Sequence, residues 1–507
     1  MKPRPPSSMH KLEISLSTTP LLTEQELDDI VHGCHKISHA PIARTDLPPE
    51  LWKQILSYLP RGTVGKMIGI NRMLFELGMN ELYGEVLLMD YRGAGLKTFQ
   101  QIRNSNIASR VYSLHIQPSF LLRMSCKGKP MRDMNENRPQ RKKRKSDIRA
   151  FLDTALTSIS DCAQLRQLNV IIHDQCISNS LAKFLQKLFK RVGRNLESLT
   201  IDMTLPSFLS IHHVFNPKLL PRLSTLIIKI NDSRGPTSKD QARRARKALH
   251  SIIQPLNATL HILAFEVINF NLSKIFQKLE QLPKLHSLEL RAEVGFSTLI
   301  PTIHFVTFLK HNADNLERLV IRRPTVDVPS SWNLEAIIGR LYNLLCVQHL
   351  PKLKELVLEV DYTSILESLT THVRTFVPHL KNLTLTGQRS TLDHVQLSSL
   401  LHGLGGGDSG LESLKISVSR FSPEHLELFS TSLPNLKRLD LSYSVLWMNN
   451  RSLVTQTGLD WDATIYEDFR TRTYPQWKLE DARIVQVDET IPTLRRVVRT
   501  RDCECRW

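Results

Sequence analysis

Cysteine is sparse in this sequence, and long apolar runs are missing from it. The seven cysteines are odd in number and lie scattered between Cys34 and Cys505, which argues against a disulfide scaffold and favours a reducing compartment. No apolar run approaches about 18 residues, so no membrane span is expected. The N-terminal stretch also lacks the apolar segment of a secretory signal. These absences predict a protein of the nucleus, the cytoplasm or both.

Motifs for catalysis and for ligand binding are equally scarce. The glycine-rich run from Gly403 to Gly410 lacks the lysine of a phosphate-binding loop and is better explained as a turn. The pair Cys503 and Cys505, like the cluster around Cys34, has no second spaced pair to complete a tetrahedral metal site. We therefore predict no cofactor, no metal site, no catalytic residue and no enzymatic activity of its own.

A leucine phrase is what the sequence has in abundance. Leu-x-x-Leu-x-apolar recurs with starts 25 to 37 residues apart, at Leu165, Leu196, Leu223, Leu260, Leu285, Leu316, Leu353, Leu380, Leu411 and Leu436. The phrase and its loose period resemble a leucine-rich repeat array, in which each unit supplies one short parallel strand and a return helix. The asparagine that regular repeats place after the strand occurs only once, as Asn231, so irregular repeats are expected. Another α/β or α-rich solenoid is the alternative.

Helical patterns fill the intervals between the phrases. Apolar residues from Leu181 to Val192 follow a helical spacing, and Ser422-Pro423-Glu424 opens a second helix that is expected to run through Leu433. Neither helix could bury its apolar side alone, so neighbouring units must stack. A further strand is expected at 111–116, an aromatic insertion at 445–480, and a last degenerate unit at 491–497.

A short stretch near the N-terminus has unusual helix signals. Pro48 and Pro49 suit a first helical turn, Leu51, Ile55 and Leu59 recur on one face, and Pro60 marks the end. Further helical patterns follow at 63–77 and 80–86. Together these residues resemble the three helices of an F-box in its fungal variant, although the Trp-containing segment of many F-boxes is replaced here by residues 70–75. The alternative is an N-terminal helical cap on the repeats.

The resemblance implies a function. A chain with an F-box and leucine-rich repeats would be the substrate-recognition adaptor of an SCF-type cullin-RING ubiquitin ligase, non-catalytic itself and monomeric outside the complex. The F-box would bind a Skp-type adaptor, and the repeats would bind an unknown protein substrate. The motif positions carried over to adaptor binding are Leu47, Pro48, Leu51, Ile55, Leu56 and Leu59. The alternatives are a repeat scaffold without a ligase role and a basic nucleic-acid-binding repeat protein.

Positive charge is concentrated in two segments. The formal net charge is +18. Residues 127–149 carry ten Lys and Arg against three Asp and Glu, or +7, and residues 239–247 carry five against one, or +4. The first segment has little apolar periodicity, which predicts a disordered basic insertion over 118–147. A candidate nuclear localisation signal within it comprises Arg141, Lys142, Lys143, Arg144 and Lys145. The alternative is a solvated loop without a targeting role.

The positions between the repeat leucines should line the concave face of the sheet, because side chains alternate along a strand. The six cations found at these positions are matched by six anions, so nucleic acid is not expected as the partner of this face, and we expect no nucleic-acid partner for the chain. Protein recognition fits better. The candidate substrate surface comprises Ile227, Lys229, Arg291, Arg318, Val320, Arg322, Glu355, Val357 and Glu359.

The sequence therefore predicts an α/β chain in which an N-terminal three-helix F-box precedes an irregular leucine-rich-repeat solenoid with a parallel concave sheet. A flexible tail with a helix at 22–37 would occupy 1–40, the F-box 41–90, and the solenoid 111–500.

Overall fold

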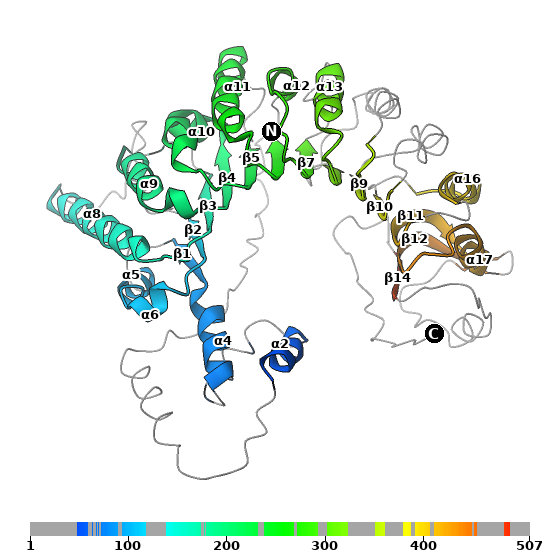
Figure 1. Cartoon of the computed structure of the whole chain (residues 1–507), viewed down its shortest axis with the longest axis horizontal. Helices are drawn as coiled ribbons and strands as arrows, with labels where there is room; N and C mark the ends of the chain where they lie inside the picture. The colour runs from blue at the N-terminus through cyan, green and yellow to red at the C-terminus, as the bar shows by residue number, and fades with distance from the viewer. Residues whose placement is uncertain are drawn as a thin grey trace, which may run out of the picture. The chain divides into compact units, whose positions relative to one another are not determined.

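A computed structural model of the chain describes residues 48–58, 63, 67, 69, 72–89, 94–117, 138–173, 177, 179–231, 238–267, 271–292, 302–322, 350–359, 379–386, 391–405, 410–448, 451–453 and 481–486 (Figure 1). The chain divides into two compact units, the first made of 1–114 with 137–164 and the second of 115–136 with 165–507. Within the described ranges, no helix is both long enough and apolar enough to cross a bilayer.

The first unit is mainly helical. Its elements are α2 (Pro49–Ser57), α4 (Arg72–Tyr83), β1 (Glu85–Leu88), α5 (Ala94–Gln101), α6 (Ser105–Ala108) and α8 (Arg138–Ser160), and β2 (Ser113–Ile116) continues into the second unit. Phe99 on α5 packs edge-on against Phe151 on α8, and the buried Ser158 hydroxyl donates a 2.7 Å hydrogen bond to the Phe99 carbonyl. These contacts attach the long helix α8 to the unit.

Helix α8 corrects one expectation. It begins at Arg138, so the prediction of disorder over 118–147 is wrong for 138–147, while 118–137 lie outside the described residues. Its C-terminal half supplies the reason, because its apolar residues follow a helical spacing and are buried: Ile148, Phe151, Leu152, Ala155, Leu156 and Ile159. The basic residues extend this anchored helix towards its N-terminus.

Helix α4 differs from the predicted pair of helices at 63–77 and 80–86. One helix runs through from Arg72 to Tyr83, because no proline or helix-breaking cluster interrupts it. Gly84 follows its last residue, at a position where a Cβ atom would clash with the Asn80 carbonyl oxygen, and strand β1 begins at Glu85. The expected third F-box helix is therefore replaced by the end of α4 and the start of β1.

The second unit is a parallel sheet with helices packed on one of its faces. Its strands are β3 (Gln167–Ile172), β4 (Ser198–Thr204), β5 (Thr225–Asn231), β6 (Ile262–Val267), β7 (Ser287–Ala292), β8 (Arg318–Arg322), β9 (Glu355–Glu359), β10 (Asn382–Leu385), β11 (Ser413–Phe421), β12 (Arg438–Met448), β13 (Arg451–Leu453) and β14 (Asp481–Gln486). Strands β3 to β12 pair in chain order and in parallel, which confirms a strand at each of the leucine phrases.

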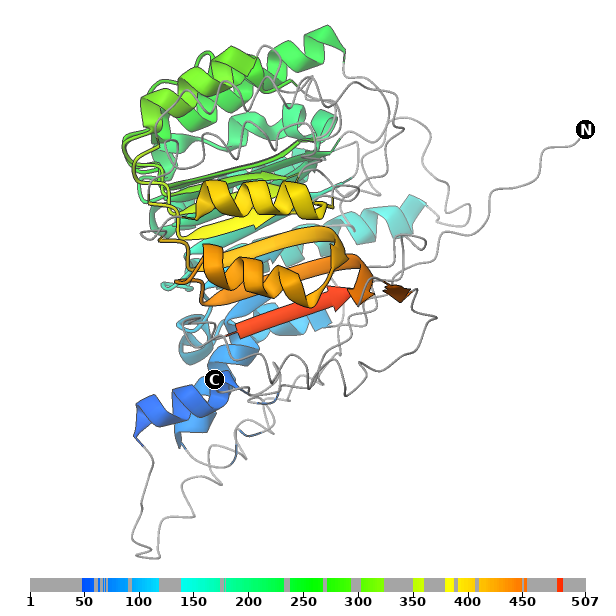
Figure 2. The ribbon, with the colours of Figure 1, turned by 90° about the vertical axis from the view of Figure 1, so that its right-hand side faces the viewer.

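The helices of the second unit are α9 (Asn179–Val192), α10 (Leu205–Ile211), α11 (Lys239–Ile253), α12 (Ser273–Phe276), α13 (Thr302–Asn312), α16 (His394–Leu404) and α17 (Pro423–Ser432). Short 3-10 helices join them at η1 (Gly193–Asn195), η2 (His212–Val214), η3 (Pro217–Leu219) and η4 (Gln254–Leu256). Figure 2 shows α16 and α17 running alongside their strands. The helices expected at 181–192 and from Pro423 are confirmed as α9 and α17.

The leucines form the core between sheet and helices. In β4 the burial alternates strictly, with Leu199, Ile201 and Met203 fully buried. The corresponding leucines of neighbouring strands are register partners, so they stack in continuous rows across the sheet. Each fully buried side chain of this size contributes about 1.5 to 3 kcal/mol through removal of apolar surface from water.

The C-terminal end of the sheet departs from the predicted insertion at 445–480. Strand β12 continues to Met448 and pairs antiparallel with β13, so part of that segment belongs to the sheet, while 454–480 lie outside the described residues. Strand β14 pairs in parallel with β12, bringing Ala482 opposite Leu439. This strand was not predicted because it lacks the leucine phrase. The unit expected at 491–497 lies outside the described residues.

Asn312 provides a test of how neighbouring repeats are held together. Its buried side chain accepts a 2.8 Å hydrogen bond from the Leu282 amide and donates one of 2.7 Å to the Phe308 carbonyl. Asn312→Ala leaves both buried groups without this partner, so we expect it to lower the free energy of unfolding by about 1 to 3 kcal/mol in urea titrations. Asn315, whose more exposed side chain donates to the Pro283 carbonyl, is the control: Asn315→Ala should cost less, and an equal loss would contradict this account.

His425 predicts a pH dependence of stability. Its Nδ1 accepts the Ser422 amide at 3.0 Å in the capping box of α17, and its Nε2 lies 3.4 Å from Nδ1 of His394. Burial and, secondarily, His394 lower the pKa of His425. Below the pKa of about 6.5 that the histidine has in the unfolded chain, the unfolded chain therefore takes up a proton that the folded chain resists. The free energy of unfolding consequently decreases as the pH is lowered, by up to about 1.4 kcal/mol per pH unit.

The matched variant is His425→Gln, because glutamine can keep the cap without titrating. Urea unfolding between about pH 7.5 and 5.5 should show a smaller loss of stability in this variant than in the wild type. The same substitution at His213, which is exposed and lies outside the α17 cap, is the control for the change of residue type. A wild-type slope retained in His425→Gln would exclude His425 as its source.

Candidate functional site

Polar side chains line the face of the second unit's sheet opposite its helices, here called the open face. In-register pairing places Asp202, Lys229, Glu266, Arg291 and Arg322 in one row across strands β4 to β8. Adjacent strands lie about 4.8 Å apart, so neighbours in the row are within reach of one another. Most neighbouring residues along this row therefore carry opposite charges.

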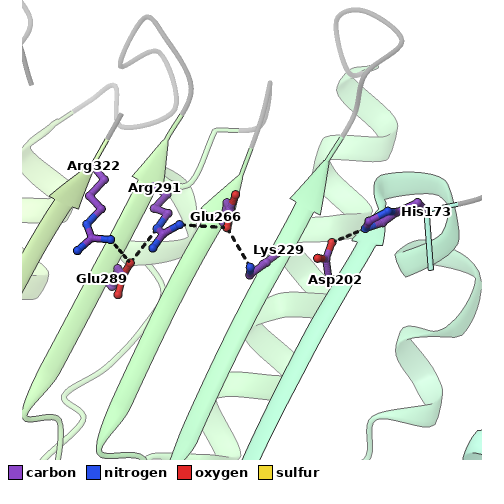
Figure 3. A network of polar contacts seen from close by, with 7 residues as sticks. All are labelled: His173, Asp202, Lys229, Glu266, Glu289, Arg291 and Arg322. Carbon is purple, nitrogen blue, oxygen red and sulfur yellow. Dashed lines mark hydrogen bonds and ion pairs between the residues drawn. The ribbon is translucent and has the colours of Figure 1, made fainter. Parts of the chain in front are cut away.

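Figure 3 shows that these side chains turn towards one another across the strands. His173 Nε2 lies 2.9 Å from Asp202 Oδ1, and Lys229 Nζ lies 3.4 Å from Glu266 Oε2. Arg291 connects this row to the next row of side chains, because it contacts Glu266 in its own row at 4.0 Å and Glu289 in the next row at 2.9 Å. The ion pairs therefore form a network rather than isolated bridges.

Glu289 is the centre of this network. Besides Arg291, it contacts Arg318 at 3.6 Å and Arg322 at 3.9 Å, and its side chain is only 19% exposed. Arg318 also reaches Glu355 on β9 at 3.0 Å. One carboxylate thus lies among three guanidinium groups, which holds the middle of the open face in a defined arrangement.

The structure brings most of the predicted substrate-surface residues together. Lys229, Arg291, Arg318, Arg322 and Glu355 all belong to the network and are partly exposed. Ile227 is half-buried in the adjacent row, opposite Ala264, and Glu359 stands opposite Arg322 in the strand register. A surface of charged, mutually paired side chains is the result.

The prediction that Val320 and Val357 are exposed is wrong. Both are buried, at 0% and 4% exposure. Val320 is the register partner of Glu289, and Arg318 and Arg322, two positions to either side of it, both reach that carboxylate. The long arginine side chains therefore flank Val320 and take it out of solvent.

Helix α2 carries the predicted adaptor-binding positions. Pro48 is its N-cap and its carbonyl accepts the Leu51 amide at 3.0 Å, so the proline-rich start works as the sequence indicates. Leu51 and Ile55 are 44% and 42% exposed, and Leu56 is half-buried. Leu47 and Leu59 lie outside the described residues. An apolar pair one helical turn apart is thus accessible to a partner.

The candidate localisation residues Arg141, Lys142, Lys143, Arg144 and Lys145 fall in the first turns of α8, and Lys143 is exposed. Their role as a signal stays a prediction.

A second row of charges was missed. It lies where the strands begin, at the residue after the first leucine of each phrase. Arg166 pairs with Glu197 at 3.2 Å, Lys354 with Glu317 at 3.0 Å, and Glu412 with both Lys381 and Lys437 at 2.8 and 3.2 Å. Hydrogen bonds from the two lysines lower the pKa of Glu412. The fixed place of these residues in the phrase was the available signal.

The described residues of the open face are mostly charged and pair with one another. In the described part of the chain, no three His, Cys, Asp or Glu side chains are grouped to hold a metal ion. The residues weighed as soft ligands, Cys34 and Cys503 with their neighbours, lie outside it. Burial raises the pKa of the Cys162 thiol to about 12, so this sulfur stays protonated and is a poor nucleophile.

Comparison with known proteins adds little. No family model matches the sequence, and no curated protein matches it. Among solved structures, the crystal structure of the Rad7 and Elc1 complex in yeast is similar at a TM-score of 0.33 and 12% sequence identity, over 87% of this chain and 98% of that one.

Glu289 allows the network to be tested. Glu289→Gln removes the charge that three arginines share, so we expect the free energy of unfolding to fall by about 1 to 2 kcal/mol, and by less in high salt. Glu317→Gln, which removes an ion pair whose side chains are 51% and 39% exposed, should cost less than about 1 kcal/mol. Urea unfolding at low and high ionic strength distinguishes them, and equal losses would mean that Glu289 has no central role.

Proposed function

We propose that this chain is the substrate-recognition adaptor of an SCF-type cullin-RING ubiquitin ligase. In this proposal α2 binds a Skp-type adaptor, and the open face of the repeat sheet binds a target protein. The observation that carries the proposal is the exposed apolar pair Leu51 and Ile55 on a helix opened by Pro48 and Pro49. Burying such a pair against a partner removes apolar surface from water and is favourable.

The repeat sheet supports the second half of the proposal. Its charges are held by ion pairs, yet several heads stay partly exposed, with Arg291 of the network at 37% and Lys415, which pairs with Asp440 on β12, at 46%. A preformed set of paired charges suits a target with complementary side chains, because little side-chain entropy is lost on binding. The target's identity is set by that complementarity.

The chain would then act by placement rather than by chemistry. Holding the target and the ligase in one assembly raises the effective concentration of target lysines near the ubiquitin carrier. Such a role needs no acid, base or nucleophile on this chain. The partner enzymes would supply them, and nuclear or cytoplasmic localisation would follow from the ligase.

Charge substitution on α2 tests the proposal. Leu51→Glu/Ile55→Glu should abolish co-purification with a recombinant Skp-type adaptor. Burying the exposed part of these two side chains is worth about 1 to 3 kcal/mol, or roughly 10- to 100-fold in affinity, and burying two carboxylates in their place would cost further free energy. Thermal melting should change little, since both positions are exposed in the free chain.

The matched control is Ile303→Glu/Val395→Glu, two exposed apolar positions on α13 and α16, at 50% and 75% exposure. This variant should keep the adaptor. Retained binding in the α2 variant, or loss in both variants, would count against docking through α2. If deletion of residues 1–90 lowered the melting temperature of the repeats, the helices would instead serve as a structural cap.

A further inference from the structure

Cations are concentrated on two helices of the second unit, α9 and α11. Helix α9 and the adjoining η1 carry no Asp or Glu; their cations, all exposed, are Lys183, Lys187, Lys190, Arg191 and Arg194. The opposite side of α9 is buried against the sheet, from Leu181 to Val192. The cations are therefore confined to the outer side, where Lys183, Lys187, Lys190 and Arg194 form a stripe at helical spacing.

Helix α11 repeats this arrangement. Its cations are Lys239, Arg243, Arg244, Arg246 and Lys247, against the single carboxylate Asp240, which contacts Arg243 at 3.3 Å. Its buried side comprises Ala245, Ala248, Leu249, Ile252 and Ile253. Glu280 lies beyond the C-terminal end of α11 and accepts a hydrogen bond from Gln254. The outer side of α11 is thus almost purely cationic.

These helices form one continuous layer. Helix α10 contacts α11, and η2, which directly follows α10, contacts α9. Helix α10 and η3 contain no acidic residue and add the exposed Lys218. Figure 1 shows α9, α10 and α11 on the same side of their strands. We call the outer side of α9, α10 and α11 the basic layer.

We propose that the basic layer binds the phosphate backbone of a nucleic-acid duplex. The stripe from Lys183 to Arg194 spans about 16 Å along the helix axis, enough to face several phosphates of a duplex, whose charges are spaced about 1.7 Å along its axis. Phosphate contacts of this kind need cations at the surface and no base-reading groups.

The surroundings of the cations favour a duplex over other anionic partners. None of the large exposed apolar side chains of the described residues lies on α9, α10 or α11. Membrane-surface helices place apolar residues beside their cations, and single-strand binders place aromatic ones there for base stacking. A protein interface would have an apolar centre. The basic layer has charge alone.

This inference revises the expectation that nucleic acid is not a partner. That expectation rested on the open face, where opposite charges pair within the network. On the helix side, cations far outnumber the acidic residues of the same helices, with none on α9 and only Asp240 on α11. The two faces of one sheet therefore differ in the partners they suit, and duplex binding is independent of the proposed adaptor role.

Fluorescence anisotropy of the full chain with a labelled duplex DNA of mixed sequence tests the proposal, with salt varied from about 50 to 200 mM. The logarithm of the binding constant should fall steeply with the logarithm of the salt concentration. The variant Lys183→Gln/Lys190→Gln/Arg244→Gln/Lys247→Gln removes four exposed cations of the basic layer. For this variant, the slope of the logarithm of the binding constant against the logarithm of the salt concentration should be shallower than in the wild type by up to about 3.6. Its affinity for the duplex should be lower by at least about tenfold.

The control variant removes the same charge and the same residue types from exposed positions outside the basic layer: Lys97→Gln/Arg103→Gln/Lys284→Gln/Lys352→Gln. It should bind the duplex nearly as the wild type does. Equal losses in the two variants would overturn the proposal, as would no binding by the wild type at about 50 mM salt. Binding to phosphatidylserine vesicles or to polyglutamate in preference to the duplex would assign the layer to another partner and equally overturn it.

Discussion

In-register pairing of parallel strands is the constraint on which the second unit depends. Where the strands begin, one backbone carbonyl accepts two amides of the next strand: the Arg166 carbonyl binds the amides of Glu197 and Ser198, and the Glu197 carbonyl those of Ser224 and Thr225. The same pattern continues to Glu412. Because a slip of one residue would turn every repeat leucine to the open face, the apolar core and this hydrogen bonding enforce the same register. They do so without the asparagines that the sequence lacks.

The register also explains the arrangement of charge. Side chains at equivalent positions become neighbours across the sheet, so each row of the open face is a sequence of residues that lie far apart along the chain. Opposite charges in a row stabilise one another, as Lys229 and Glu266 do, whereas like charges need a third group. Arg291 and Arg322 are register partners, and both contact Glu289 from the next row. The network therefore follows from the register as well as from composition.

The limits of sequence reasoning have the same physical origin. A leucine phrase predicts its strand because alternation leaves one way to bury Leu199 and Ile201 together. The burial of Val320 depends on two arginines turning to a carboxylate of another strand, a contact that no local pattern contains. Helix α8 was obscured because its basic first turns precede its apolar residues, and β14 because Ala482 and Ile484 replace leucines. The exposed pair on α2 was predictable, since it needs only helical spacing and two prolines.

The three surfaces differ in the force that would hold a partner, and this makes them separable. Binding through Leu51 and Ile55 would rest on apolar burial, which moderate salt changes little. Binding to the basic layer would rest on counterion release and weaken steeply with salt. Binding to the open face should have an intermediate salt dependence, because a target must compete with the ion pairs already present, such as that of Lys415 and Asp440 at 2.6 Å. A chain that joins one partner by apolar contact and others by charge can keep the first while ionic conditions regulate the rest.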